Sequence, residues 1–472
     1  MKQLILNIII FLIIGNNPVL GQVQKDLLLK MNSDLNYLQE VIQSSHPSVY
    51  QYIGKSTLDS LFTKLQFKTS DSLTKKELEK RIRLILSKIG CVHTYIVQPN
   101  RTTDKVFPLL FYAQNNDLFV IKDFEKEVDV NKRFKVLSIN GNTSASIITK
   151  MKDYRPSDGY NSTFKYQLIN SASWFNKMYE FYFDSDSIKT ITLIDSINNS
   201  IQIRRKLIPI EKNIAVSEKG YGSQFGKSIK LKFSENNIAI LKISSFSGLP
   251  VFGKYINGNL YKKALKAIED NNTQTLIIDL RNNTGGDALS GYRFVSHFID
   301  KKHKILIQHH KGKAFKYATF KSKIGLVLNS FLGNLFSGRI PLFKEQKSYV
   351  QIKPREKIYT GKVLVLTNGI TLSTASNVAS IFKYKTNAIL AGEETGGGEN
   401  LLNAYVFPRI KLPNSQIKIQ IPQYRVDLGL VNNAGSGVTP DIEVPSNIKS
   451  IVIGEDWVLN EILLRIRTTN LD

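Results

Sequence analysis

The sequence predicts a multidomain protein of the α/β class. After residue 213, apolar runs typical of strands alternate with a helical pattern, in the order "IAILKI", "YKKALKAIE", "TLIIDL" and "AILAG". This alternation implies βαβ crossovers and a parallel sheet, with ligands expected at the carboxyl ends of its strands. The chain has 472 residues, 42% of them hydrophobic, which is enough apolar material for two or three domains.

Three blocks follow a segment with the pattern of a secretory signal. Lys2 precedes an apolar run from Leu4 to Ile14, and Gly21 offers a small residue at the expected cleavage point. A membrane anchor is the alternative, although the run is short for a span. We therefore expect a signal peptide at 1–21 and a periplasmic or secreted protein. The predicted blocks are an N-terminal helical cap at 22–105, a β-rich domain at 106–212, and an α/β core at 213–465 with a lid-like segment at 301–350.

The net charge of +25 does not by itself indicate nucleic acid. The lysines are scattered singly, and no recognition-helix, finger or RNA-binding signature is present, so no nucleic-acid partner is expected. The densest basic stretch joins an apolar one over 301–336, which makes it a candidate for contact with a membrane surface or for a lid over a peptide groove. His303, His309 and His310 lack a carboxylate at ligand spacing, so we expect no metal and no cofactor.

Cys91 is the only cysteine of the chain. An internal disulfide is therefore excluded, and an exported protein of this composition must depend on packing for its stability. A lone cysteine among apolar neighbours is more often buried and inert than nucleophilic. We expect Cys91 to be structural.

A serine at a strand-to-helix junction is the first candidate for a reactive group. The run from Val363 to Leu366 predicts a buried strand, and the spacing of Ala375, Val378, Ala379 and Phe382 predicts a helix from about Thr374. Ser373 then lies at the helix N-terminus. It can cap the helix, or it can be a nucleophile beside backbone N–H groups that stabilise an oxyanion. The local pattern leaves both interpretations open.

A glycine pair ends a neighbouring predicted strand in "LIIDLRNNTGGD", residues 276–287. Gly285 and Gly286 allow the backbone to approach a ligand closely or to turn its N–H groups inward. Glycine pairs are common in loops, but together with Ser373 this turn makes a two-sided oxyanion hole plausible.

The motifs "DLRNNTGG", "LSTAS" around Ser373 and "AGEETGGG" (391–398) occur in the order and spacing of the S41 peptidases, the family of C-terminal processing and tricorn-type serine proteases. The resemblance extends over roughly 35–445, through "GCVHTYIV" (90–97), "FKVLSINGNTSASII" (134–148) and "GVTPDIEV" (437–444). It implies a ClpP/crotonase-like α/β core, and it places the family's nucleophile on Ser373, with Thr371 and Ser376 as neighbours.

The resemblance also indicates the general base. Relatives of the Ser–Lys kind carry a lysine at the position of Gly398, so that base is absent. Tricorn-like relatives use a histidine from the N-terminal region, which corresponds to His93. Histidine can take the serine proton and return it to the leaving amine. Cys91 and Val92 replace the usual Asp-Gly before it, and its orienting acid stays open among the carboxylates Asp427, Glu399 and Asp441. His46, before a proline, is expected to be structural.

The resemblance implies a degenerate PDZ-like domain at 106–212, without the usual Gly-Leu-Gly-Phe loop for a terminal carboxylate. Arg281 is expected to brace its turn, with a substrate carboxylate as the alternative ligand. The predicted activity is that of a serine endopeptidase acting on extended or unfolded polypeptides. Ser373 is the nucleophile, His93 the base, and the backbone N–H groups of Gly286 and Thr374 form the oxyanion hole. The alternative is a binding protein for peptides or apolar ligands that retains the S41 scaffold without catalysis.

Overall fold

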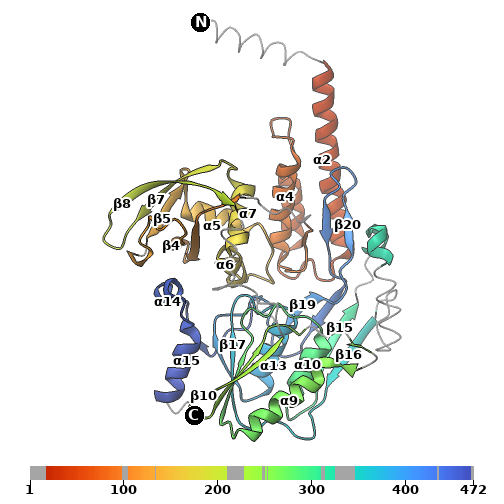
Figure 1. Ribbon diagram of the computed structural model, residues 1–472. Coiled ribbons are helices and arrows are strands. Elements are labelled where there is room, and N and C mark those ends of the chain that lie inside the picture. The colour runs from red at the N-terminus through yellow and green to blue at the C-terminus, as the bar shows by residue number, and fades with distance from the viewer. Residues whose placement is uncertain are drawn as a thin grey trace.

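The computed structural model describes residues 18–97, 105–132, 134–209, 228–246, 250–251, 254–309, 314–324, 346–432 and 435–468. Two lobes lie above a third (Figure 1): a helical region with α2 and α4, a β-rich lobe with β4 to β8, and an α/β core below both. Among the described helices, none is long and apolar enough to cross a membrane. Most of the predicted signal peptide lies outside the described residues.

The helical region has its own apolar core. Its helices are α2 (Pro18–Ser45), α3 (Lys55–Lys64) and α4 (Lys75–Ile89). Helix α4 begins where Thr74 accepts from the Glu77 N–H at 3.2 Å, and it ends at Gly90 in the left-handed conformation. The sheet that completes this core is β1 (Tyr95–Ile96), β21 (Lys418–Gln420) and β20 (Arg409–Lys411), in that order. Buried Ile410, Leu412 and Ile419 of the distant β20–β21 hairpin join the helices in one cluster.

The β-rich lobe is an antiparallel sheet packed against three helices. Its strand order is β3 (Leu109–Gln114), β4 (Asp117–Asp123), β5 (Lys135–Ile139), β7 (Ile188–Ile194) and β8 (Ser200–Lys206), with β6 (Asn142–Thr143) paired to β5. The helices are α5 (Ser144–Lys152), α6 (Thr163–Ile169) and α7 (Ala172–Tyr182). The strand-turn-helix expected at 134–148 is present as β5, β6 and α5. Helices α6 and α7 were not predicted.

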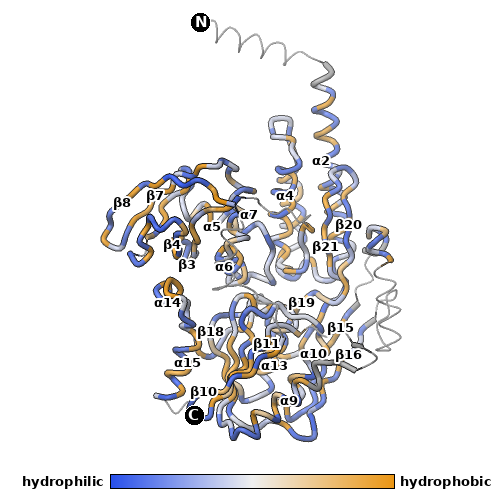
Figure 2. Tube along the Cα trace, in the orientation of Figure 1, coloured by the Kyte–Doolittle hydropathy of each residue, from blue (hydrophilic) through white to orange (hydrophobic). Residues whose placement is uncertain are grey.

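The core contains the predicted parallel sheet, and the expected α/β class is confirmed. The strand order is β10 (Ile229–Ser234), β11 (Ile238–Ile243), β14 (Thr275–Asp279), β17 (Lys362–Thr367), β18 (Ile389–Gly392) and β23 (Ile442–Glu443), with only β10 antiparallel. One apolar cluster joins this sheet to helices α9 (Ile256–Asp270), α10 (Ala288–Val295) and α13 (Thr374–Lys385). A second joins it to α15 (Trp457–Thr468). Figure 2 shows the central strands and α13 as the apolar centre of this lobe.

The predicted lid-like segment is only partly described. Its ends form β15 (His303–His309) and β16 (Gln346–Ile352) in a sheet of order β16-β15-β22-β19, with β22 at Tyr424–Asp427 and β19 at Leu401–Ala404. Short α11 (Ala314–Tyr317) follows β15. His310 and residues 325–345 lie outside the described residues. The remaining elements are β2 (Lys105–Val106), β9 (Ile208–Pro209), β12 (Pro250–Val251), β13 (Lys254–Tyr255), the 3-10 turn Val130–Lys132 and α14 (Ile448–Ile453).

Candidate active site

Four loops meet at the carboxyl ends of parallel strands β11, β14, β17 and β18. The Leu372 N–H donates to Asn283 O at 3.0 Å, so the loop after β17 lies on the loop after β14. The Phe246 N–H donates to Gly285 O at 2.9 Å and adds the loop after β11, while the Gly397 N–H donates to Thr371 O at 3.1 Å and adds the loop after β18. The motifs, although distant in the sequence, therefore meet at one edge of the sheet, as parallel topology requires.

Ser373 occupies the N-cap position of α13 but does not cap the helix. Its backbone has φ 53° and ψ −124°, and its side chain makes no capping hydrogen bond. Its carbonyl accepts from the Asn377 N–H at 3.0 Å and from Ser376 Oγ at 2.8 Å. A positive φ is strained for serine and is found mainly where the surrounding structure imposes it, often at functional turns. The capping interpretation of Ser373 is therefore wrong, and its hydroxyl is free to react.

The neighbouring hydroxyls of Thr371 and Ser376 are both hydrogen-bonded. Thr371 is buried, and its Oγ1 donates to Leu280 O at 3.0 Å and accepts from the Asn368 N–H at 3.1 Å. Ser376 is buried, and its Oγ is bonded to the Ser373 carbonyl. Among the three hydroxyls, that of Ser373 is the one for which the described residues provide no hydrogen-bond partner.

The glycine turn lies directly against Ser373. A β-carbon added to Gly285, whose φ is +98°, would lie 2.9 Å from Ser373 Cβ and 2.9 Å from Thr374 N. Buried Asn283 fixes this turn, since its side chain accepts from the Gly285 N–H at 2.8 Å and donates to Ile243 O at 2.9 Å. Sequence reasoning did not single out Asn283, although it stands inside the quoted motif.

Gly286 and Thr374 are the two expected oxyanion donors. Gly286 has φ +130°, and its carbonyl accepts from Thr374 Oγ1 at 2.9 Å, which ties the two residues together. Within the described part of the chain, no acceptor takes the backbone N–H of either residue. Two unused N–H groups beside a free serine hydroxyl are the arrangement that stabilises an oxyanion.

His93 lies in a turn between α4 and β1. Its imidazole stacks on Phe407, with ring centroids 5.1 Å apart, and makes a backbone hydrogen bond with Asn403. Nδ1 is buried without a partner, so the bond to Asn403 uses Nε2. Burial, and then the positive charge of Arg155, lower the pKa of His93 to about 4. The ring is therefore neutral at physiological pH, with Nδ1 as its free acceptor. No hydrogen bond joins His93 to Ser373 in the described structure, so their expected pairing stays a prediction.

The three candidate orienting acids have other partners. Asp427 accepts from Asn400 Nδ2 at 2.9 Å, Glu399 accepts from the Tyr384 hydroxyl, and Asp441 accepts from the Leu390 N–H at 2.8 Å. None of them bonds to His93. The ring is held by a backbone carbonyl, a partner that a search for carboxylates could not find.

Asp158 links the histidine turn to the loop after β18, a role that no sequence pattern indicated. It is 3% exposed, and its two oxygens accept from the Val92 N–H at 2.9 Å and the Gly398 N–H at 3.3 Å. Burial raises its pKa to about 6. Gly397, next to Gly398, packs on Ser373, since a β-carbon there would lie 2.9 Å from Ser373 N. Gly398, where relatives carry a lysine, thus serves as a backbone donor.

The other residues singled out from the sequence have structural environments. Cys91 is fully buried, and burial raises the pKa of its thiol to about 12. Buried His46 bonds through Nε2 to Thr94 Oγ1 at 3.0 Å. Arg281 forms ion pairs with Asp279 at 2.9 Å and Asp456 at 2.6 Å, so it braces its turn as expected. His303 bonds to Leu428 O at 2.8 Å.

This arrangement has a counterpart among known families. Residues 237–444 match the peptidase family S41. The chain contains an S41 peptidase domain. The expected recognition is thereby confirmed, and the enzyme class is that of a serine-type peptidase.

Solved structures resemble this chain in fold along nearly its whole length. Mature CPAF complexed with lactacystin is 15% identical and has a TM-score of 0.64, with 93% of this chain and 98% of that chain covered. Mature CPAF alone gives 14% identity, 93% and 97% coverage and a TM-score of 0.64. A CPAF mutant is 13% identical, with 94% of this chain and 99% of that chain covered, and has a TM-score of 0.61. At this identity the likeness concerns the fold, and it includes the two upper lobes as well as the S41 domain.

Proposed function

We propose that this S41 peptidase is a serine endopeptidase in which Ser373 attacks the peptide carbonyl and His93 is the general base. The observation that carries the proposal is the strained Ser373 turn, whose hydroxyl does not cap α13 and which packs against the glycine turn at Gly285. Serine is a weak nucleophile until a base removes its proton, and the free Nδ1 of neutral His93 is suited to that step.

The reaction then follows acyl-transfer chemistry. Ser373 Oγ forms a bond to the carbonyl carbon as its proton passes to His93, and the N–H groups of Gly286 and Thr374 stabilise the oxyanion. The imidazolium returns the proton to the leaving amine. Water then attacks the acyl-enzyme with His93 again as the base, which releases the acid product and restores the Ser373 hydroxyl. His93 must approach Ser373 for this, through a movement of its turn relative to the core, because catalytic hydrogen bonds often tighten only when substrate binds.

We further propose that the substrates are extended or unfolded polypeptides. Strand β1 follows His93 directly, and it lies at the edge of the β1-β21-β20 sheet. An edge strand offers main-chain groups to an added strand, so an extended chain can be bound there by β-augmentation. Folded proteins, whose main chain is already paired, are expected to be cleaved more slowly.

Labelling with a fluorophosphonate tests the proposed nucleophile. The probe should label the wild-type protein and not Ser373→Ala, and His93→Ala should slow labelling by two or more orders of magnitude. Ser376→Ala is the matched control, because that hydroxyl is already bonded to a carbonyl, and it should be labelled near the wild-type rate. Absence of wild-type labelling, with a folded protein, would favour the non-catalytic binding protein.

The proposed location is the periplasm or the medium, on the basis of the signal-peptide pattern at 1–21. N-terminal sequencing of protein from the native cell should begin at Gln22. An intact N-terminus in the cytoplasmic fraction would contradict export.

A further inference from the structure

Three cationic side chains meet where the helical region contacts the β-rich lobe. They are Arg83 of α4, Arg155 of the loop after α5, and Lys177 of α7, and we name them the cation cluster. Arg83 Nη1 donates to the carbonyl of Tyr154 at 2.7 Å, next to Arg155. The Arg155 guanidinium and Lys177 Nζ lie 5.9 Å and 5.6 Å from the centroid of the same ring, that of Trp174. Burial and then the charges of Arg83 and Arg155 lower the pKa of Lys177.

The cation cluster has no counter-ion among the described residues. Arg83 is 4% exposed, yet its Nε and Nη2 have no hydrogen-bond partner, and neither has Arg155 Nε. Glu79 lies one turn before Arg83 on α4 and Glu180 one turn after Lys177 on α7, and neither forms an ion pair with the cluster in the part of the chain that is described. A buried charge without a counter-ion is destabilising. The Arg83 guanidinium lies 3.9 Å from the centroid of the Tyr154 ring, which offsets part of this cost, but no described carboxylate neutralises the cluster.

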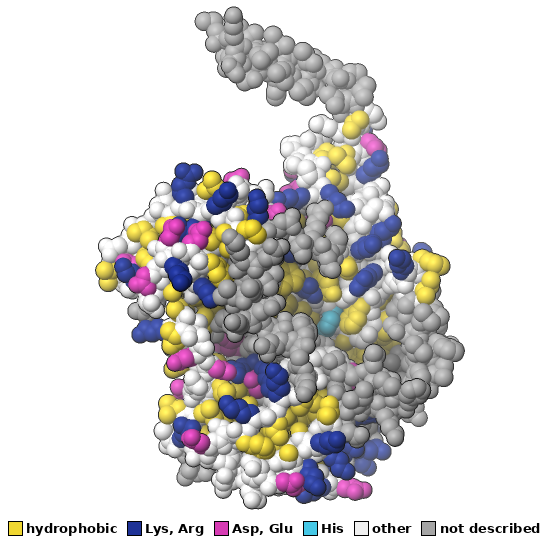
Figure 3. Space-filling model, in the orientation of Figure 1, with side chains coloured by type: hydrophobic (Ala, Val, Ile, Leu, Met, Phe, Trp, Pro, Cys, Tyr) yellow, Lys and Arg dark blue, Asp and Glu magenta, His cyan; other side chains and the backbone are white. Residues whose placement is uncertain are grey.

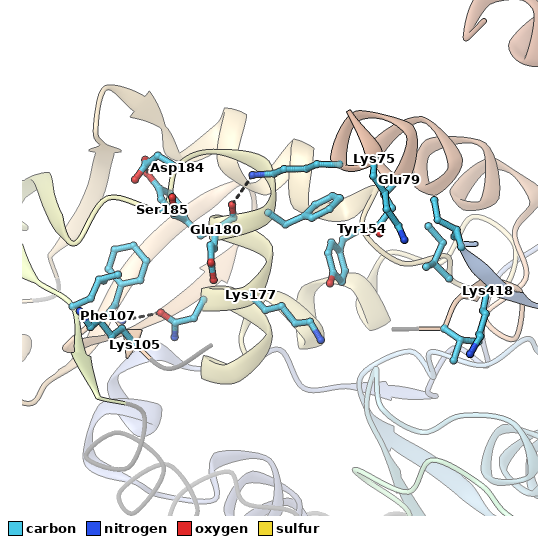
Figure 4. A pocket seen from close by; sticks show the side chains of 18 of the residues that line it. Lys75, Glu79, Lys105, Phe107, Tyr154, Lys177, Glu180, Asp184, Ser185 and Lys418 are labelled. Carbon is cyan, nitrogen blue, oxygen red and sulfur yellow. Dashed lines mark hydrogen bonds between the residues drawn. The ribbon is translucent and has the colours of Figure 1, made fainter. Parts of the chain in front are cut away.

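The cluster borders a large cavity that a ligand can enter. The cavity has a volume of about 1060 Å³, and Tyr154 and Lys177 are among its lining residues. Figure 4 shows Tyr154 and Lys177 near each other between α7 and α4, with Lys418 of the β21 strand beyond them. Figure 3 shows many Lys and Arg side chains on the surfaces of the helical region and of the β-rich lobe.

The same cavity reaches the edge strand next to the histidine turn. Its lining includes Ile96 of β1 and Val97 after it, three and four residues beyond His93, although neither His93 nor Ser373 lines it. The Arg155 guanidinium lies 3.7 Å from the centroid of the Tyr95 ring, two residues after His93. An extended chain advances about 3.3 Å per residue, so a substrate strand on β1 would bring a side chain to Arg155 about two or three residues from the reacting bond.

We propose that the cation cluster is a subsite for an acidic side chain of the polypeptide substrate. The proposal rests on the proposed function, because it places the acidic residue relative to a bond cleaved at Ser373. Arginine offers a planar fork that matches a carboxylate, and the uncompensated charge makes a neutral side chain a poorer ligand. The cavity continues beyond the cluster to Lys105 and Asp184, so the bound chain does not have to end there.

Paired peptides test this subsite. Each pair carries Glu or Gln at one position within three residues of the cleaved bond. Wild-type enzyme should show at least a tenfold preference in kcat/KM for Glu at one position. Arg155→Gln and Lys177→Gln should each reduce that ratio towards one, while Arg155→Lys should retain part of it. Arg204→Gln, an exposed arginine on β8, is the matched control and should keep the full ratio. Lys177 is only half-buried, so its variant tests the subsite even if Arg155→Gln unfolds.

The outcomes separate the subsite from the catalytic proposal. Binding of the same peptides to Ser373→Ala, followed by fluorescence anisotropy, should also favour Glu, without any turnover. Equal binding and equal cleavage of both peptides would overturn the subsite, whereas preferred binding with no wild-type cleavage would overturn only the proposed hydrolysis. The preference should persist when the peptide C-terminus is amidated. A preference lost on amidation would show that the cluster recognises a terminal carboxylate, and would overturn the side-chain assignment.

Discussion

Gly285 packs against the backbone of Thr374, so closely that a β-carbon on Gly285 would lie 2.9 Å from the Thr374 nitrogen. Real β-carbons do not approach a backbone this closely, so one of the two backbones has to move if the glycine is replaced. The contact couples the two halves of the candidate oxyanion hole. Gly286, which carries one donor N–H group, directly follows Gly285, and Thr374 carries the other. The geometry of the turn and that of the nucleophile are therefore set together.

Gly285→Ala should reduce kcat by about 100-fold or more, the cost of displacing one oxyanion donor. Steady-state peptide hydrolysis measures this effect. Gly141→Ala is the matched control, because Gly141 also has a positive φ, +77°, but a β-carbon there meets nothing within 4 Å. Gly141→Ala should lose about 1 kcal/mol of stability through backbone strain, and Gly285→Ala should lose more, because its β-carbon also meets backbone atoms at 2.9 Å. Equal kcat values in the two variants would show that the contact at Thr374 has no catalytic role.

Ser373→Gly should be inactive but more stable to thermal unfolding than Ser373→Ala. Glycine adopts the positive φ of this turn without the steric cost that alanine retains, and that cost is about 1 kcal/mol or more. Thermal unfolding of the two purified variants gives the comparison. A glycine variant less stable than the alanine variant would mean that the strain is absent in solution.

The activity should persist to unusually low pH for a histidine base. Burial lowers the pKa of His93 to about 4, so its neutral, proton-accepting form remains populated well below pH 6.5. In Asp158→Asn, where no carboxyl titrates at this position, the acidic limb of kcat/KM should therefore have its midpoint near pH 4–5. The profile is best measured in Asp158→Asn as well as in the wild type, since Asp158 titrates near pH 6. A midpoint at about 6.5 in both would show that His93 is solvated in the active form.

Cys91→Ala should retain most of the activity and lose about 1 kcal/mol of stability, the cost of a small cavity. The thiol is fully buried, and its pKa is raised to about 12, so it is not a thiolate near neutral pH. Native protein should accordingly resist iodoacetamide, while unfolded protein should react. Loss of activity in Cys91→Ala, with Ser373→Ala still active, would reverse the assigned roles.

Much of the core could be predicted because its signals are local. The buried run 363–366 lies within β17, and α13 begins at Thr374, as the apolar spacing indicated. Helix α7 was missed, although Phe175, Met178 and Tyr179 have helical spacing, because short apolar runs on both sides favoured strands. The β20–β21 hairpin could not be assigned to the helical region, since no local pattern encodes a contact with α2 and α4 more than 300 residues earlier.

The candidate site was likewise predictable from the sequence only in part. Motif order brought Ser373 and the glycine turn together correctly, because strand order fixes which loops meet at one edge of a parallel sheet. The φ of Ser373, which decides that its hydroxyl does not cap α13, depends on packing by Gly285 and Gly397. Asp158 escaped notice because its importance comes entirely from two backbone partners, Val92 and Gly398, that are distant in sequence.

Asp158→Asn should lower kcat, because the asparagine NH₂ group would face a backbone N–H group from which the carboxylate now accepts. The native carboxylate accepts two backbone N–H groups, whereas an asparagine side chain offers one oxygen and one NH₂ group, so either Val92 or Gly398 loses its acceptor. The turn that carries His93 is then no longer fixed to the loop packed on Ser373. Peptide hydrolysis should fall about tenfold or more in kcat, with fluorophosphonate labelling slowed in proportion. Asp300→Asn, at an exposed carboxylate, is the control and should leave both rates unchanged.

The same variant should change how stability depends on pH. The pKa of Asp158 is raised from 3.8 to about 6 in the folded protein, so between these values the folded state binds more protons than the unfolded state. The contribution of Asp158 is therefore most favourable below pH 4 and is lost as pH rises through 6, by at most about 3 kcal/mol. Denaturant unfolding at pH 4.5 and pH 7 should show wild type gaining stability over Asp158→Asn at the lower pH. A difference between the two proteins that stays constant with pH would mean that Asp158 titrates normally, with its carboxylate solvated and the bridge between the two turns open.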